Sequence, residues 1–162
     1  MIRKASPQDA VAIAAIYNFY VETSIATFDT EPKTPTYFKQ RIAEVQVAHP
    51  WVVFEGNDEP LWGYAYGVQL KPRKAYSRSC EISVYLHPNA SGKGIGTQLY
   101  SALIEDLKDR GMHAIIGGVS LPNQASVRLH EKLGFEKVAH FKEVGFKFGK
   151  WIDVGYWQLI VD

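Results

Sequence analysis

The sequence predicts a mixed α/β fold, with helices around one central sheet, in a single domain covering residues 1–162. The length of 162 residues suits one domain. Hydrophobic residues make up 46% of the chain and charged residues 22%, as is typical of globular proteins. Helical and strand-like spacings of apolar residues alternate along the chain, without repeats. The expected order is one strand, two helices, three strands, then helix, strand, helix and the terminal strands.

Apolar residues at helical spacing predict the helices. Ser6 is suited to cap the first helix, and Pro7 fits its first turn. Glycines follow the last two helices and are typical stop residues. The remaining helices are expected over residues 36–47, 94–110 and 123–133.

Strands are predicted where β-branched and aromatic residues lie between turn residues. Residues 23–35 hold two prolines and are expected to be irregular, and residues 71–79 form a basic, polar loop. The expected strands cover residues 51–55, 61–70, 81–86 and 113–119, with two or three more between 135 and 161 and a turn near residues 148–150.

The charge balance argues against two classes of partner. Lys and Arg number 18 against 17 Asp and Glu, so the basic excess of a nucleic-acid-binding protein is missing. No apolar run reaches the length of a membrane span, and the N-terminus lacks the apolar stretch of a signal peptide. The single cysteine, Cys80, favours a reducing compartment. We expect a cytoplasmic protein with no nucleic-acid partner, no membrane association and no metal site.

A glycine-rich turn is the most informative segment. Gly92, Gly94 and Gly96 follow a predicted strand and open a helix, where free backbone N–H groups and the helix dipole favour a phosphate. A Walker A loop is excluded because His87 occupies the position of its first glycine and Gly94 follows Lys93. The glycine spacing also differs from a dinucleotide fingerprint. On this segment alone, a purely structural turn remains an alternative.

A second segment, residues 123–135, begins at Asn and ends in Leu-Gly-Phe. With the glycine turn, it resembles the GNAT superfamily of acyl-CoA N-acyltransferases. Residues 26–32, 83–88 and 144–151 are similar to the phosphinothricin and methionine-sulfoximine N-acetyltransferase branch. One departure is Ser91, which stands where the cofactor motif usually opens with Gln or Arg. Because that motif acts through backbone N–H groups, we expect at most a slight loss of cofactor affinity.

The resemblance implies a mostly antiparallel sheet with a splayed strand pair that holds acetyl-CoA. Backbone contacts to its acetyl and pantetheine portion are implied at Val84, Tyr85 and Leu86. Lys132 is implied as a further contact, with a solvated helix lysine as the alternative. The residues implied for the diphosphate and the cofactor arm are Gly92, Lys93, Gly94, Ile95, Gly96, Thr97 and Asn123.

Glu81 is the predicted catalytic base, because a carboxylate inside a strand is unusual unless it is paired or functional. Strand alternation places Glu81 and Tyr85 on one face, opposite Ile82. A salt bridge with Arg73, Arg78 or another cation is the alternative. Ile82 stands where the branch often has His, so a mechanism that requires a histidine at this position does not suit this chain. Cys80 is expected to be a buried structural thiol.

His130 occupies the position of the superfamily tyrosine that protonates the thiolate, with a packing role as the alternative. The resemblance implies a homodimer and a small amino-acid substrate. A protein N-terminus or lysine as the acceptor, and a catalytically silent CoA-binding module, stay open as alternatives. Lys147 is a further candidate for the pocket wall, and the predicted substrate-binding residues are Phe28, Lys74, Ala75, Tyr76 and Glu81.

Overall fold

The computed structural model describes residues 1–162 and contains helices on both sides of one sheet. Short 3-10 turns precede α1, follow β3 and precede α3. The elements are β1 (Ile2–Lys4), α1 (Ala10–Thr23), α2 (Pro35–Val45), β2 (Trp51–Glu55), β3 (Leu61–Gln69), β4 (Ser79–Leu86), α3 (Ile95–Asp109), β5 (Ala114–Leu121), α4 (Gln124–Lys132), β6 (Glu136–Lys147) and β7 (Lys150–Ile160).

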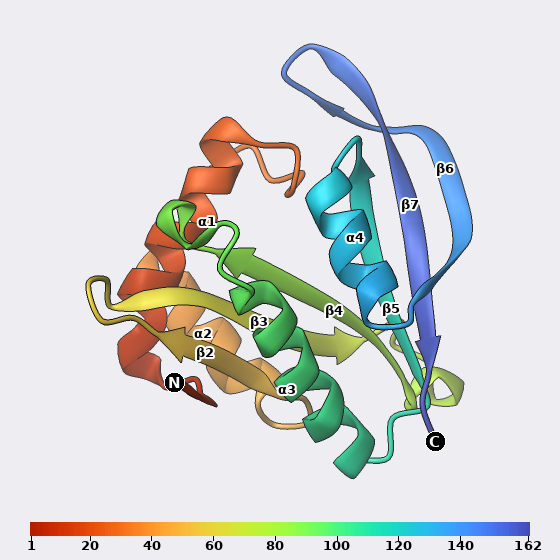
Figure 1. Cartoon of the computed structure of the whole chain (residues 1–162), viewed down its shortest axis with the longest axis horizontal. Coiled ribbons are helices and arrows are strands. Elements are labelled where there is room, and N and C mark those ends of the chain that lie inside the picture. Colours follow the sequence, from red (N-terminus) through yellow and green to blue (C-terminus); the bar gives the residue numbers. More distant parts are fainter.

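The strands form one seven-stranded sheet in the order β1-β2-β3-β4-β5-β7-β6 (Figure 1). Only β4 and β5 pair in parallel, and every other neighbouring pair is antiparallel. The predicted fold class and order of elements are therefore confirmed. The helix ends differ by one or two residues; α2, for example, ends at Val45 rather than 47. The terminal region contains two strands, joined by the expected turn at Phe148 and Gly149.

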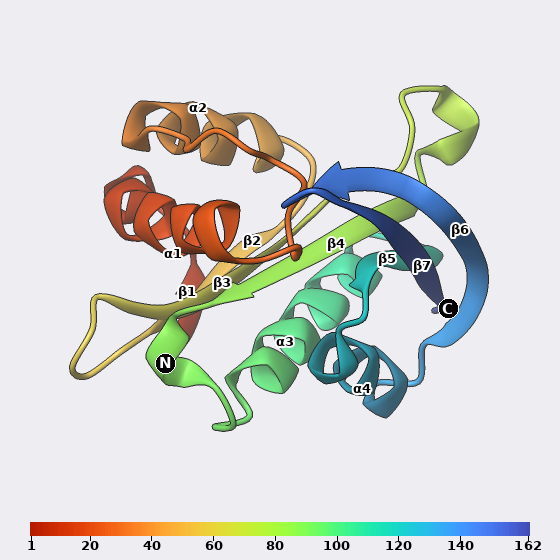
Figure 2. The ribbon, with the colours of Figure 1, turned by 90° about the horizontal axis from the view of Figure 1, so that it is seen from above.

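The helices cover the two faces of the sheet (Figure 2). One apolar cluster joins α1 and α2 to β2 and β3, and it includes Tyr64 and Trp51. The other lies on the opposite face and packs α3 against β4 and β5. Cys80 and Ile82 of β4 belong to the α3 side, whereas Tyr85 packs on the α1 side. The predicted alternation along β4 is therefore correct.

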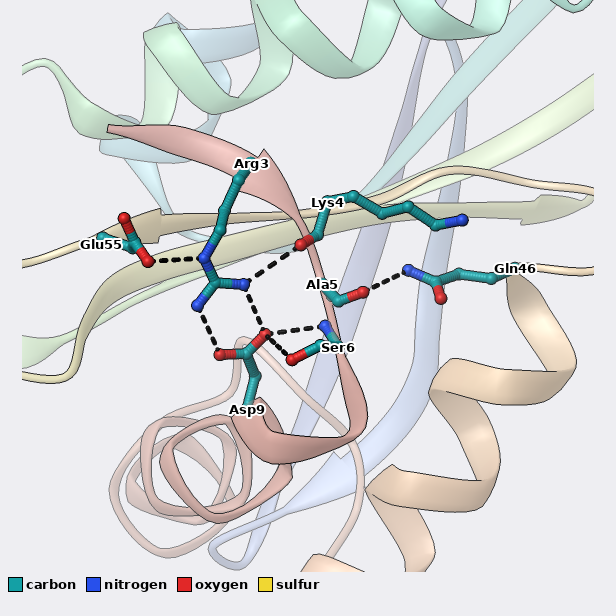
Figure 3. Close-up of polar contacts among 7 residues, drawn as sticks. All are labelled: Arg3, Lys4, Ala5, Ser6, Asp9, Gln46 and Glu55. Carbon is teal, nitrogen blue, oxygen red and sulfur yellow. Dashed lines mark hydrogen bonds and ion pairs between the residues drawn. The ribbon is translucent and has the colours of Figure 1, made fainter.

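A polar network anchors the N-terminus (Figure 3). The guanidinium of Arg3 donates to both carboxylate oxygens of Asp9 at 2.8 Å and to Glu55 at 2.6 Å. The backbone N–H of Ser6 also donates to Asp9, at 2.8 Å. Burial acts to raise the pKa of Asp9, but the bonds from Arg3 and Ser6 outweigh it and hold that pKa below its usual value. This network ties β1 to β2 and to the start of α1.

The β6–β7 hairpin extends beyond the body of the sheet and curves over its α1 side (Figure 2). Phe146 and Trp151 face each other across it, with ring centroids 4.8 Å apart. We call its exposed apolar residues the apolar arm: Val138, Phe141, Val144, Phe146, Phe148 and Trp151. No helix of this structure combines the length and the apolar character that crossing a membrane requires.

Candidate active site

A cavity lies where β4 and β5 separate. The two strands pair only from Ser79 with Ala114 to Ile82 with Gly117, although both continue for four more residues. Past this point the strands enclose a cavity of about 340 Å³. That volume is in the range of small-molecule sites. The cavity is bounded by β4, β5, the glycine-rich turn, the start of α4 and the end of α1.

Strand β4 forms one wall of the cavity with Val84, Tyr85 and Leu86. On one side these residues pair with β3, but on the other side β5 no longer accompanies them. The Leu86 carbonyl accepts a hydrogen bond of 2.5 Å from the hydroxyl of Tyr20, which also lines the cavity. The separation of the strands therefore leaves one edge of β4 open in the middle of the sheet, where strand edges are normally paired. A ligand can bind this edge.

The glycine-rich turn forms the next wall. Gly92 and Gly94 have φ angles of 75° and 73°, in the left-handed region that favours glycine. Gly94 is also the N-cap of α3, so the first N–H groups of the helix have no partner within it. This arrangement suits an anion. The Lys93 ammonium lies 3.8 Å from the centre of the Trp62 ring, in a cation–π contact.

The predicted cofactor residues divide into two groups. Val84, Tyr85, Leu86, Gly92 and Asn123 line the cavity, together with Ser91. The rest of the turn lies beside the cavity and does not line it, and Ile95 is buried in the core. Lys132 is exposed in the last turn of α4 and is absent from the wall. The second group therefore comprises Lys93, Gly94, Ile95, Gly96, Thr97 and Lys132.

Asn123 lines the cavity and also has a structural role. It caps α4, because its side-chain oxygen accepts a hydrogen bond of 3.1 Å from the backbone N–H of Ser126. The cap begins α4 directly after β5, so Ser126, Leu129 and His130 also reach the cavity.

His130 is buried in the wall of the cavity and packs edge-on against Tyr100 and Phe135. Its Nδ1 lies 2.7 Å from the Ser126 carbonyl oxygen, and its Nε2 has no partner. A carbonyl only accepts, so the proton is on Nδ1 and the neutral ring carries a lone pair on Nε2. Burial lowers the pKa of His130 and so disfavours the imidazolium form.

Glu81 lies on β4, on the face opposite Cys80, and is half-buried. Its carboxylate forms no ion pair, so the alternative of a salt bridge with Arg73 or Arg78 is not realised. Arg78 instead donates to the Gly111 carbonyl oxygen at 2.8 Å. Burial raises the pKa of Glu81. An unpaired carboxylate with a raised pKa is a stronger base than an exposed one.

Cys80 is fully buried, and burial raises the pKa of its thiol to about 12. A thiol with so high a pKa is a poor nucleophile near neutral pH. These properties agree with the expected structural role.

The predicted substrate residues lie outside the cavity. Lys74 and Ala75 are exposed and Tyr76 is half-buried on a short 3-10 turn between β3 and β4. Phe28 is 39% exposed, and its ring packs against Gly145 of β6. Lys147 is buried, but its ammonium bonds three backbone carbonyls and does not line the cavity.

Sequence reasoning missed most of the cavity residues, among them Tyr20 and Tyr100. Tyr20 reaches Leu86 from α1, and Tyr100 contacts His130 from α3. Each belongs to an apolar helical stripe, so only tertiary packing separates them from ordinary core residues.

Comparison with known proteins decides the family. Residues 2–155 match the family described as acetyltransferase (GNAT) domain. This chain belongs to that family. Over 157 residues it is 37% identical to a phosphinothricin N-acetyltransferase of Streptomyces viridochromogenes, covering 97% of this chain and 85% of the relative. Over 166 residues it is 36% identical to an L-methionine sulfoximine/L-methionine sulfone acetyltransferase of Salmonella typhimurium, covering 99% and 94%.

Solved structures of this GNAT family support the same fold. A Salmonella typhimurium acetyltransferase, solved with its cofactor acetyl-CoA, is 34% identical and superposes with a TM-score of 0.96. The match covers 100% of this chain and 94% of that one. The present GNAT chain is therefore an acyltransferase with the family architecture.

Proposed function

We propose that this protein transfers the acetyl group of acetyl-CoA to the α-amine of a small amino acid such as phosphinothricin, methionine sulfoximine or methionine sulfone. The observation that carries the proposal is the cavity between the separated strands β4 and β5. Glu81 lies one residue before the last pair of these strands, Ile82 with Gly117, and does not itself line the cavity. The named relatives act on this substrate class, which supports the choice of acceptor.

Acetyl-CoA fits the chemistry of the cavity walls. The left-handed glycines and the free N–H groups at the start of α3 suit its diphosphate. The unaccompanied edge of β4 offers backbone groups to the amide-containing pantetheine arm, and on this proposal the thioester lies near the point where the strands separate. Residues Gly92–Thr97 and Asn123 are proposed to hold the cofactor on these grounds.

Glu81 is proposed to remove the proton from the substrate ammonium, directly or through water. The freed nitrogen lone pair then attacks the thioester carbonyl carbon. The new C–N bond forms a tetrahedral oxyanion, and its collapse breaks the C–S bond. A fixed donor to that oxyanion is worth up to about 4 kcal/mol of barrier. The departing thiolate takes up a proton, so that the products are the acetylated amine and free CoA.

Donation of that proton from His130 would require the imidazolium. The neutral ring with its proton on Nδ1 holds a lone pair on Nε2, and burial disfavours a second proton. The geometry therefore favours the packing alternative, and the proposal leaves protonation of the thiolate to solvent.

The test measures free thiol release from acetyl-CoA over a panel of amino acids, with purified peptides as competing acceptors. The proposal expects turnover with small amino acids bearing a second anionic or sulfonyl-like group. Turnover only with peptide N-termini or lysines would establish the alternative acceptor. Tight cofactor binding without any turnover would instead indicate a silent CoA-binding module.

We also propose a homodimer, with a second copy of this chain on the apolar arm. Exposed apolar residues gather there on β6, which is a 12-residue edge strand. A long apolar edge is unfavourable in a monomer. Sedimentation of the protein and of Trp151→Lys checks this, since the proposal expects a dimer that the substitution dissociates. A monomeric protein at high concentration would refute it.

A further inference from the structure

Lys147 is an unusual lysine because it is buried without a carboxylate partner. It ends β6, and its side chain is among the few buried charged groups of the protein, with 4% exposure. Its Nζ donates to the carbonyl oxygens of Ser24 at 2.6 Å, Thr27 at 2.8 Å and Tyr20 at 3.4 Å. These three bonds use all the hydrogens of the ammonium.

The three carbonyls lie at the end of α1 and in the segment that follows it. Tyr20 is in the last turn of α1, and Ser24 is its C-cap. The carbonyls at a helix C-terminus carry partial negative charge. The Tyr20 carbonyl oxygen also accepts a hydrogen bond of 3.0 Å from the Ser24 N–H. The last turn of α1 has no basic residue of its own. Lys147 supplies that charge from a strand more than a hundred residues away in the sequence.

The segment held by this ammonium, residues 24–29, reaches the cavity through one residue and packs against β6 through another. Ala26 lines the cavity between β4 and β5. The ring of Phe28 fills the space above Gly145, where a Cβ would approach the ring to 2.3 Å. On the α1 side, the Tyr17 hydroxyl bonds the Thr27 hydroxyl at 2.8 Å and also the Asp29 carboxylate. The contacts of Lys147 and Gly145 therefore join this segment to the end of β6.

We propose that Lys147 is a positioning residue, which fixes residues 24–29 against β6 so that this segment forms the amine-side wall of the site. The inference rests on the proposed N-acetyltransferase function and deepens it. Lys147 does not touch the reacting atoms. It acts through Ala26 and Phe28, and the cofactor side, built on β4 and the glycine turn, does not depend on it.

The test compares Lys147→Met with Lys150→Met. Lys150 is exposed and pairs directly with Lys147 across the hairpin, so it controls for loss of a positive charge at this position. Lys147→Met should raise the KM for the amino acid by about tenfold to a hundredfold, because small misplacements of a site wall have effects of this size. The Kd for acetyl-CoA should change less than about twofold, and Lys150→Met should match the parent protein.

A double-mutant cycle with Phe28→Ala tests the route of the effect. If Lys147 acts through the segment that carries Phe28, the two losses in kcat/KM are not additive. Additive losses, an equal loss of acetyl-CoA affinity or an unchanged amino-acid KM would each overturn the inference.

Hydrogen exchange gives a readout that does not need a substrate. Amides of residues 24–29 should exchange faster in Lys147→Met than in Lys150→Met, while those of β4 stay unchanged. If Lys147→Met fails to fold, Lys147→Gln retains two N–H donors and takes its place in both measurements. Unchanged exchange in residues 24–29 would overturn the inference. Absence of turnover in the parent protein would instead refute the proposed function and leave the exchange result valid.

Discussion

The two sides of the candidate site are built in different ways. On the proposed cofactor side, the groups offered to the ligand are backbone: the unaccompanied edge of β4 and Gly92 in the cavity wall, with Gly94 and the first turn of α3 beside it. On the proposed amine side, the groups are side chains from distant segments: Glu81 of β4, which lies outside the cavity wall, and Ala26 of the segment held by Lys147. Backbone recognition depends on local conformation, whereas side-chain recognition depends on tertiary packing.

This difference predicts which substitutions the site tolerates. On the cofactor side, replacing a side chain should have little effect on cofactor affinity unless it alters the backbone φ angle. For this reason we expect Ser91 to be tolerated at the first position of the motif. On the amine side each side chain either contacts a specific partner or has none, and its role depends on this. Single substitutions there should therefore have large effects on turnover.

The largest effect is expected at Glu81. Glu81→Gln removes the base while keeping the size of the side chain, so kcat should fall by about 10²–10⁴-fold. The Kd for acetyl-CoA should remain nearly unchanged, because the cofactor walls are backbone. Steady-state kinetics and calorimetry measure the two quantities. Full turnover in this variant would show that another group takes the proton.

The pH profile gives a second test of the same group. The active form of Glu81 is the carboxylate, so activity should rise as pH rises through its pKa. Burial raises that pKa, which places the acidic limb of kcat/KM above the usual glutamate value of about 4.3. Glu81→Gln should lose this limb. A limb that persists in the variant would belong to a different residue.

On the cofactor side, Gly94→Ala should weaken acetyl-CoA binding by roughly tenfold. Nothing lies within 4 Å of the added Cβ, so the cost is the left-handed backbone, about 1–2 kcal/mol. Gly149→Ala is the matched control, because that glycine has a φ of 71° and equal space but lies in the β6–β7 turn. Calorimetry should detect weaker binding in the first variant only. Equal affinities would mean that the turn does not hold the cofactor.

A smaller effect is expected at His130. His130→Phe keeps an aromatic ring against Tyr100 and Phe135, so kcat should fall by less than about tenfold. If the imidazolium were the proton donor, the parent kcat would decline as pH rises through the pKa of His130, which burial holds below the usual histidine value. We expect no decline from about pH 6 to pH 8. A decline that His130→Phe abolishes would restore the catalytic role.

The smallest effect concerns a region remote from both sides. Arg3→Ala should lower the free energy of unfolding by about 1 kcal/mol, because Arg3 is partly exposed and solvent screens its pairs. The pKa of Asp9 is held below its unfolded value, so this stabilisation is present above that value and is lost as pH falls through the folded pKa. Denaturant titrations of both proteins should converge in acid, and kinetics should not change.

Much of the fold followed from local patterns. The helical stripe of α3, the alternation along β4 and the glycines after α3 and α4 each specify an element, because periodicity and φ preference act within a few residues. The cap at Asn123 was readable as the start of a helix for the same reason. The ends of α2 differed because the last turn of a helix depends on what packs beside it.

The site was less predictable than the fold. Sequence reasoning found Val84, Gly92 and Asn123 through motif positions, and the cavity contains them. It missed Tyr20 and Tyr100, since a tyrosine in an apolar stripe looks like a core residue. Residues 74–76, implied for the substrate, lie on an exposed turn outside the cavity, and their role stays a prediction.

By itself the sequence determined the order of elements, the glycine turn and the carboxylate of Glu81 within a strand, because these depend on neighbouring residues. Only the tertiary structure decided that β4 and β5 part after Ile82 and Gly117, that Glu81 has no ionic partner, and that Lys147 binds the end of α1. Those facts depend on contacts between segments far apart in the chain, and local propensity carries no information about which distant carbonyls an ammonium will meet.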